Sequence, residues 1–226
     1  MLIDLYDTLI VCDFGPVHAA LAARLGVPAP VVVAAYDATR PGRGRGDFPD
    51  REAAMRVIVE RCGHPADPPL VRTLVSVERD ALAAEARLFP DSLDAVRGLR
   101  EDGYATVLVS NCAPASGGVV DSLGLTDEFD AVVLSFAVGA LKPAAAIYHT
   151  ALDAIGVDAS HGWFVDDQRS YCDGARAVGL ATLQIRRYPA VGADPPGGHR
   201  VVDSLDAARR RIAAHRAAGS TGPAGR

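Results

Sequence analysis

The sequence predicts an α/β fold in which a doubly wound parallel sheet carries an inserted helical module. From Phe89 to Ile185, segments with helical spacing of apolar residues alternate with short apolar runs, as in parallel strands joined by crossover helices. Between residues 14 and 86, directly after an opening apolar strand, only helical patterns occur. The chain has 226 residues and is 49% apolar, which is enough to fill a sizeable core.

The opening strand lies in the run MLIDLYDTLI, which contains Asp4, Tyr6 and Asp7. Only three residues precede Asp4, whereas strands usually run about five or six residues, so we expect a few further residues upstream of Met1. Carboxylates buried at the end of a strand are costly unless an opposite charge, a hydrogen bond or a metal compensates them. The run therefore indicates a functional site as well as a strand.

The helical module comprises four predicted helices, at residues 16–25, 30–38, 50–61 and 69–86. Asp50 is a suitable N-cap for the third helix, which stops at Gly63. Glycine and arginine alternate in RPGRGRGDF (residues 40–48), between the second and third helices. We expect a mobile loop there.

The alternating part begins with a helix that Asp91 caps and Gly103 ends, followed by the strand ATVLVSN, whose apolar part ends at Ser110. The pattern continues with a helix near 114–123, the strand DAVVLS (130–135), a helix that Pro143 opens, the strand GWFVDD (162–167), the helix DGARAVG (173–179) and the strand LATLQI (180–185). This order predicts a parallel sheet with crossover helices.

These elements divide the chain into four predicted parts. They are a core from residues 1–13 and 87–187, the helical module at 14–86, a linker and C-terminal helix at 188–217, and a disordered tail at 218–226. Within the third part, PAVGADPPGGHRV is the linker, and we expect a short amphipathic helix to follow it.

Composition excludes several function classes. The formal charge of −5 argues against general nucleic-acid binding, and we attribute the arginines near the C-terminus to a solvated helix face. No apolar run approaches the roughly 20 residues of a membrane span, so we expect a cytoplasmic protein with no membrane partner. Neither zinc nor disulfides are expected, because four cysteines lack paired spacing: Cys12, Cys62, Cys112 and Cys172.

Polar residues follow four of the predicted strands. Asp4 and Tyr6 follow the first, Ser110 and Asn111 end the second, and Asp166 with Asp167 end the fourth. Lys142, which stands before a helix after the third strand, is the one lysine among 23 basic residues. Ligands of doubly wound sheets bind beyond the carboxyl ends of the strands, so we expect these side chains to form one site.

This set of residue types suits displacement at an anionic centre. Asp4 is placed to attack and form a covalent adduct. Lys142 and Ser110 would hold the anionic group of a small substrate, and Asp4 with Asp166 would share a hard cation such as Mg²⁺. Without a cation, the carboxylates would repel the substrate.

Four motifs make residues 1 to about 187 resemble the haloacid dehalogenase superfamily of hydrolases. They are IDLYDTL with Asp4 and Thr8, VLVSN with Ser110, GALKPAAAIY with Lys142, and FVDDQRSYCDGARAVG with Asp166 and Asp167. The resemblance implies a Rossmann-like core, an Asp4 nucleophile, and an α-helical cap (residues 14–86) that closes over the site and selects substrates. Arg40, Arg43 and Arg45 are then candidate cap contacts to an anionic substrate.

The sequence departs from the family at Tyr6, where most of its phosphatases carry an acidic residue that protonates the leaving group. The 2-haloacid dehalogenases resemble this chain there, since halide needs no proton, and also at Asn111 and Tyr148. They work without metal, however, whereas the acidic pair Asp166 and Asp167 implies Mg²⁺. The implied residues are Asp4, Tyr6, Ser110 and Lys142 for catalysis, Thr8, Asn111, Lys142 and Tyr148 for substrate, and Asp4, Tyr6, Asp166 and Asp167 for the metal.

Three functions stay open from the sequence. The first is a Mg²⁺-dependent phosphatase acting on a small phosphorylated metabolite through an aspartyl-phosphate at Asp4. The second is a metal-independent 2-haloacid dehalogenase. The third is a catalytically silent binding protein on the same fold, since Tyr6 and Tyr171 both depart from the phosphatase pattern.

Overall fold

The structure of the protein is a computed structural model. It describes residues 1–188 and 198–220, and the side chains up to residue 217. Most of the predicted linker therefore lies outside the described residues, as do positions 221–226 of the predicted tail.

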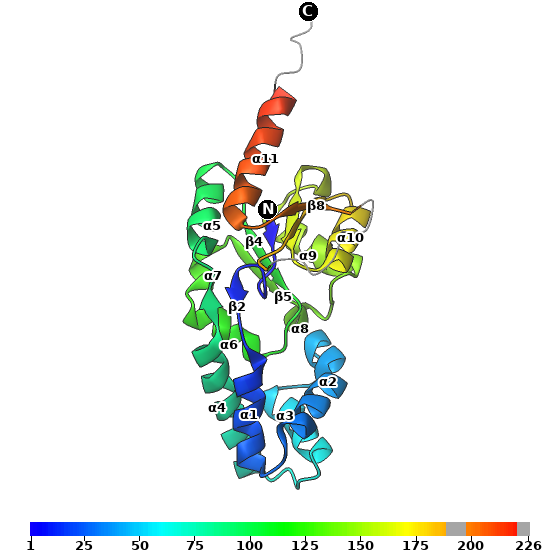
Figure 1. The fold of residues 1–226 in the computed structure, drawn as a ribbon. Helices are drawn as coiled ribbons and strands as arrows, with labels where there is room; N and C mark the ends of the chain where they lie inside the picture. Colours follow the sequence, from blue (N-terminus) through cyan, green and yellow to red (C-terminus); the bar gives the residue numbers. More distant parts are fainter. Residues whose placement is uncertain (189–197, 221–226) are drawn as a thin grey trace, which may run out of the picture.

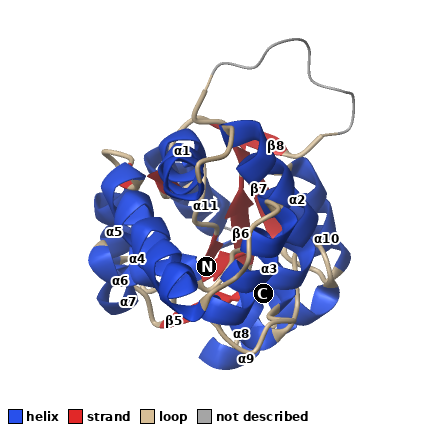
Figure 2. Cartoon of the chain, turned by 90° about the horizontal axis from the view of Figure 1, so that it is seen from below, coloured by secondary structure: helices blue, strands red, loops and turns tan. Residues whose placement is uncertain are grey.

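A six-stranded parallel sheet forms the centre of the described chain (Figures 1 and 2). Its order is β5-β4-β1-β6-β7-β8, so the first strand lies between two later ones, as in a doubly wound sheet. The strands are β1 (Leu2–Ile3), β4 (Val107–Ser110), β5 (Ala131–Leu134), β6 (Trp163–Asp166), β7 (Ala181–Ile185) and β8 (Arg200–Val202). The predicted fold class is confirmed.

Helices cover both faces of the sheet, because alternate residues of each strand point to opposite sides. Leu2, Val107 and Phe164 pack on one side, while Ile3 and Leu108 pack on the other. The helices of this part are α5 (Ser92–Glu101), α6 (Ala115–Ser122), α7 (Leu125–Glu128), α8 (Ser135–Val138), α9 (Ala145–Ile155), the 3₁₀ helix η1 (Ala159–His161), α10 (Arg169–Ala177) and α11 (Leu205–Ser220).

Four helices occupy the segment after the first strand and lie below the sheet in Figure 1. They are α1 (Phe14–Leu25), α2 (Ala29–Arg45), α3 (Arg51–Arg61) and α4 (Pro68–Glu85). The Asp50 side chain accepts a hydrogen bond from the backbone N–H of Ala53, so its predicted role as N-cap is confirmed. The short antiparallel strands β2 (Ile10–Val11) and β3 (Arg87–Leu88) pair where the chain leaves the sheet and returns. Separate domains at these points stay a prediction.

The predicted mobile loop at residues 40–48 is wrong, because α2 continues to Arg45. The Arg43 guanidinium is buried over the Tyr36 ring, and it donates hydrogen bonds to the Tyr36 carbonyl and the Thr39 hydroxyl. Gly44 lies against Leu141, and a Cβ atom added at Gly44 would lie only 2.9 Å from Leu141 Cδ2. The contacts of Arg43 within α2 and the packing of Gly44 against Leu141 together outweigh the low helix propensity of the glycines.

Other boundaries also differ from the predictions. The first strand ends at Ile3, Asp7 has a left-handed backbone (φ 56°), and the helix expected from Pro143 begins at Ala145. Strand β8 pairs with β7 inside the predicted linker, and α11 continues into the predicted tail, as far as Ser220. None of the single described helices is long and apolar enough to cross a membrane; α1 and α2 meet that test only as a pair bent by 112°.

Candidate active site

Lys142 lies at the centre of a buried charged cluster beyond the carboxyl ends of β1, β4 and β6. Its Nζ atom donates to Asp4 Oδ1 at 2.5 Å, to Asp166 Oδ2 at 2.6 Å and to the Val109 carbonyl at 3.1 Å. The lysine side chain and that of Asp166 are fully buried, and that of Asp4 is 7% exposed. The structure therefore brings Lys142 together with Asp166, which is 24 positions away in sequence, and with Asp4, which is 138 positions away.

The charge of this cluster is not balanced within the protein. Burial alone would lower the pKa of Lys142, but Asp4 and Asp166 raise it above its ordinary value, so the lysine is an ammonium. Burial, with the nearby charge of Asp4, raises the pKa of Asp166 well above its usual range, and the same two causes raise the pKa of Asp167 to about 6. The single ammonium of Lys142 therefore does not supply enough positive charge to keep the pKa values of Asp166 and Asp167 in their ordinary range.

The three carboxylates fit a divalent cation. One ligand oxygen of each of Asp4, Asp166 and Asp167 lies within 4.8 Å of the other two. Oxygen donors of this kind suit Mg²⁺ or another hard cation, and a cation would offset the excess negative charge. The Tyr6 phenol donates a hydrogen bond to Ser116 Oγ at 2.9 Å. Tyr6 as a metal ligand stays a prediction.

A cavity of about 650 Å³ opens from the cluster toward the helical module. Asp4, Lys142 and Asp167 lie on its sheet side, and the wall opposite comes from α1, α2 and α4. The residues of that wall are Phe14, Val17, His18, Tyr36, Arg40, Pro41, Arg43, Gly44, Glu78 and Leu82. A ligand in this cavity would contact the charged cluster at one end and the helical module at the other.

The wall of the cavity that the helices form carries one carboxyl group, Glu78, and two arginines. Glu78 accepts a hydrogen bond from the Tyr36 hydroxyl at 2.8 Å and is itself buried. Of the three arginines predicted to contact an anionic substrate, Arg40 and Arg43 line the cavity. Arg45 instead forms an exposed ion pair with Asp47 and is not among the residues that line the cavity.

Asn111 positions the segment that carries Lys142. Its side chain donates to the Lys142 carbonyl at 2.9 Å and accepts from the Lys142 N–H at 2.7 Å, while it also lines the cavity. Tyr171, from α10, lies beside the same lysine, with Nζ 5.0 Å from its ring centroid. Tyr171, which belongs to the motif of Asp166 and Asp167, therefore places the face of its aromatic ring beside the Lys142 ammonium.

Tyr148, Thr8 and Ser110, which were also predicted as site residues, are not among the described residues that line the cavity. Tyr148 is buried and donates to the Tyr171 carbonyl at 2.6 Å, so its hydroxyl is used in packing α9 against α10. Within the described chain, the hydroxyl groups of Thr8 and Ser110 are buried and have no hydrogen-bond partner. A buried hydroxyl without a partner is costly, which leaves both groups available to a ligand or a solvent molecule.

Arg187, which no local sequence pattern indicates, holds the turn after Asp4. Its guanidinium donates to the Thr8 carbonyl from Nε at 3.0 Å and from Nη2 at 2.6 Å, and to Asp91 at 2.7 Å. Its side chain is 5% exposed. Because Arg187 and Thr8 are 179 residues apart, no local pattern could have identified the contact.

Comparisons with known proteins agree with this arrangement. The family model described as haloacid dehalogenase-like hydrolase matches residues 1–179. The chain is 28% identical over 149 residues to a glyceraldehyde 3-phosphate phosphatase of Methanopyrus kandleri, which covers 65% of this chain and 64% of that one. It is 34% identical over 100 residues to an (S)-2-haloacid dehalogenase of Pseudomonas sp. (strain YL), covering 44% and 43%. The chain thus spans less than two thirds of either relative.

A solved structure supports the fold. The 2-haloacid dehalogenase of Pseudomonas syringae pv. Tomato DC3000 superposes with a TM-score of 0.73 at 21% identity, covering 95% of this chain and 97% of that one. At this identity the match shows a shared fold and no more.

Proposed function

The chain belongs to the haloacid dehalogenase-like hydrolases, and we propose that it is a Mg²⁺-dependent phosphatase that acts on a small phosphorylated metabolite. One observation carries the proposal: three carboxylates lie within 4.8 Å of one another, a single ammonium contacts two of them, and two of the three have raised pKa values. A metal-free displacement needs one nucleophilic carboxylate. The further acidic pair is explained best by a divalent cation.

Asp4 is the proposed nucleophile. Lys142 holds one oxygen of Asp4 at 2.5 Å and so fixes the direction in which the carboxylate faces the cavity. Attack by the carboxylate on phosphorus would form an aspartyl-phosphate and release the alcohol, and water would then cleave the acyl-phosphate to return Asp4 and inorganic phosphate. Asp4, Asp166 and Asp167 would hold Mg²⁺. When bound, that ion would screen the carboxylates from the phosphate and stabilise charge on its oxygens.

Protonation of the leaving group is the unusual part of the proposed reaction. The acid expected from the family is replaced by Tyr6, whose pKa is raised by burial, more than its hydrogen bond to Ser116 lowers it. A phenol of this kind is a poor proton donor near neutral pH. We therefore expect turnover to depend strongly on how well the leaving oxygen carries negative charge.

The cavity limits the substrate. A volume of about 650 Å³ suits a compact metabolite. Arg40 and Arg43 favour a negative group at the end away from the cluster, while Phe14 and Leu82 offer apolar surface. The matched glyceraldehyde 3-phosphate phosphatase acts, by its name, on a substrate of this size.

Phosphate release from a panel of phosphorylated metabolites tests the proposal. We expect release in Mg²⁺, none in chelator, and none from Asp4→Asn or Asp166→Asn, which should both keep the circular-dichroism spectrum of the parent. Arg97→Gln, far from the cavity in an exposed ion pair with Glu128, is the matched control and should turn over normally. Full activity of either aspartate variant would reject the mechanism.

The second candidate is a 2-haloacid dehalogenase. The observation that favours it is Tyr6, since carbon–halogen cleavage needs no proton donor, and a dehalogenase is among the matched relatives. Its test is halide release from short 2-halocarboxylates in the presence of chelator. Release under those conditions would favour the dehalogenase over the phosphatase.

A further inference from the structure

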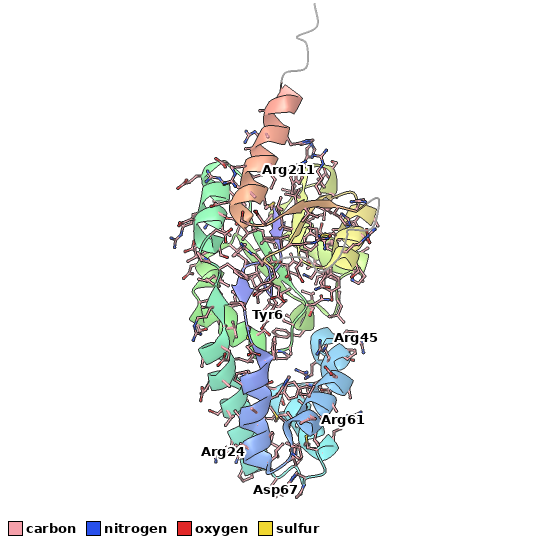
Figure 3. All side chains as sticks on the ribbon, in the orientation of Figure 1. Tyr6, Arg24, Arg45, Arg61, Asp67 and Arg211 are labelled. Atoms are coloured by element: carbon pink, nitrogen blue, oxygen red, sulfur yellow. The ribbon has the colours of Figure 1, made fainter. Side chains whose placement is uncertain are left out.

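A second concave surface lies outside the candidate active site, between strand β8 and helix α11. This open groove has a volume of about 880 Å³ and is lined by four arginines, from the end of β7, from β8 and from α11. They are Arg186, Arg200, Arg210 and Arg211. Figure 3 shows Arg211 on α11, at the end of the molecule opposite Arg24 of α1. We call this surface the arginine groove.

Three of the four groove arginines add positive charge that no described residue neutralises. Arg200, Arg210 and Arg211 are exposed, and the side chain of none of them makes an ion pair or a hydrogen bond with another described residue. Among the described residues that line the groove, Asp203 is the one carboxylate, and it accepts a hydrogen bond from the neighbouring Ser204 hydroxyl. Arginines that repel one another in a chain of formal charge −5 indicate a surface that receives an anion.

The neighbouring arginines show what a structural role looks like in the same helix. Arg209 donates to the Asp102 carboxylate at 2.7 and 3.2 Å, and Arg216 donates to the Asp102 carbonyl at 2.9 Å. Both therefore fasten α11 to the end of α5. Arg210 and Arg211 lie between these two and have no such contact, so they are not needed to dock the helix.

We infer that the arginine groove is a binding site for an oligophosphate, meaning a ligand with consecutive phosphate groups. Each guanidinium is a planar fork that binds a phosphate through two N–H groups. Arg200 comes from β8, whereas Arg210 and Arg211 come from α11, so a chain of phosphate groups offers each of these two elements a phosphate of its own. A nucleic-acid duplex is disfavoured, because a protein that binds DNA through its phosphates can make about 6–10 such contacts, whereas three arginines without a described side-chain partner line this groove.

The chain carries its own probe for this site. Trp163 is the one tryptophan of the sequence, and its ring lies 5.3 Å, centroid to centroid, from that of His215, which lines the groove. Ligand binding beside His215 should therefore change the Trp163 emission. The Asp4→Asn background in chelator prevents turnover in the candidate active site, so that any signal reports binding alone.

The experiment is a titration with tripolyphosphate, followed by calorimetry and by Trp163 emission. Arg200→Gln/Arg211→Gln removes one charge from each wall of the groove, and Arg24→Gln/Arg56→Gln removes two exposed charges from the helical module as the matched control. We expect saturable binding that weakens at least about tenfold in the groove variant and stays within about twofold of the parent in the control. Phosphate release by the otherwise native enzyme should be equal in both double variants.

The outcomes separate the possible sources of the ligand. ATP binding more tightly than tripolyphosphate would identify a nucleotide, and equal affinities would identify the phosphate chain itself; both support the inference. Absence of saturable binding, or an equal loss in the two double variants, would overturn it. Tighter binding of a DNA duplex, with an affinity that grows with its length, would also overturn it in favour of a nucleic-acid surface. All of these results are independent of whether the candidate active site proves to be a phosphatase.

Discussion

Replacing Lys142 by methionine tests the charge balance of the candidate active site. The substitution keeps an unbranched side chain but removes an ammonium that is fully buried and contacts two carboxylates. Breaking a buried ion pair by removal of one partner costs about 3–5 kcal/mol. With two carboxylates left, we expect a loss of about 4 kcal/mol or more in the free energy of unfolding, or a fall of about 8–16 °C in the melting temperature for a chain of this length.

The assay is thermal and urea unfolding at neutral pH, with and without Mg²⁺. Because the variant leaves three carboxylates with no cation, Mg²⁺ should stabilise Lys142→Met more than it stabilises the parent. Arg97→Gln breaks an exposed ion pair and should cost less than about 1 kcal/mol. If Lys142→Met unfolds like the parent in chelator, Lys142 does not compensate Asp4 and Asp166, and the reasoning fails.

Three further predictions concern residues in or near the candidate active site. Arg187→Met removes both guanidinium donors from the Thr8 carbonyl. It should therefore lower the free energy of unfolding by about 3 kcal/mol, and it should lower kcat more than it raises KM. Melting curves equal to those of the parent would contradict this. Tyr6→Phe should keep phosphate release from alkyl phosphates within about threefold of the parent, since a phenol of raised pKa is a poor acid. Loss of activity on alkyl but not on aryl phosphates would make Tyr6 the proton donor. Gly174→Ala places a Cβ atom 2.6 Å from the Pro143 carbonyl oxygen. It should therefore lower the free energy of unfolding by about 1–3 kcal/mol and reduce turnover. The control is Gly118→Ala, whose new Cβ atom meets no atom closer than 4.0 Å.

The order of elements and the charged cluster of the candidate active site could be predicted from the sequence. Buried strands and amphipathic helices have strong local patterns, and the rule that ligands bind beyond the carboxyl ends of parallel strands connects Asp4, Lys142 and Asp166 from the sequence alone. The scarcity of lysine singled out Lys142 for a physical reason, since arginine cannot replace a compact ammonium between two carboxylates.

Contacts away from the carboxyl ends of the strands could not be predicted. The local composition of glycine and proline argues against a helix through Arg43. That helix is supported by the contact of Arg43 with Tyr36 within α2 and by the packing of Gly44 against Leu141. Strand β8 has only three residues, too few for a periodic signal, and it forms because β7 presents a free edge. Tyr148 matches the family's motif, but its hydroxyl donates a hydrogen bond to the Tyr171 carbonyl.

The most direct test of the central claim is whether Asp4 accepts a phosphoryl group in the presence of Mg²⁺. Beryllium fluoride mimics a phosphoryl group on a carboxylate, so its effect on the melting temperature needs no knowledge of the substrate. The account predicts that beryllium fluoride with Mg²⁺ stabilises the parent protein, while neither reagent alone does so fully and Asp4→Asn gains nothing. If the parent shows no stabilisation beyond that of Asp4→Asn, Asp4 is not the nucleophile of a Mg²⁺-dependent phosphatase.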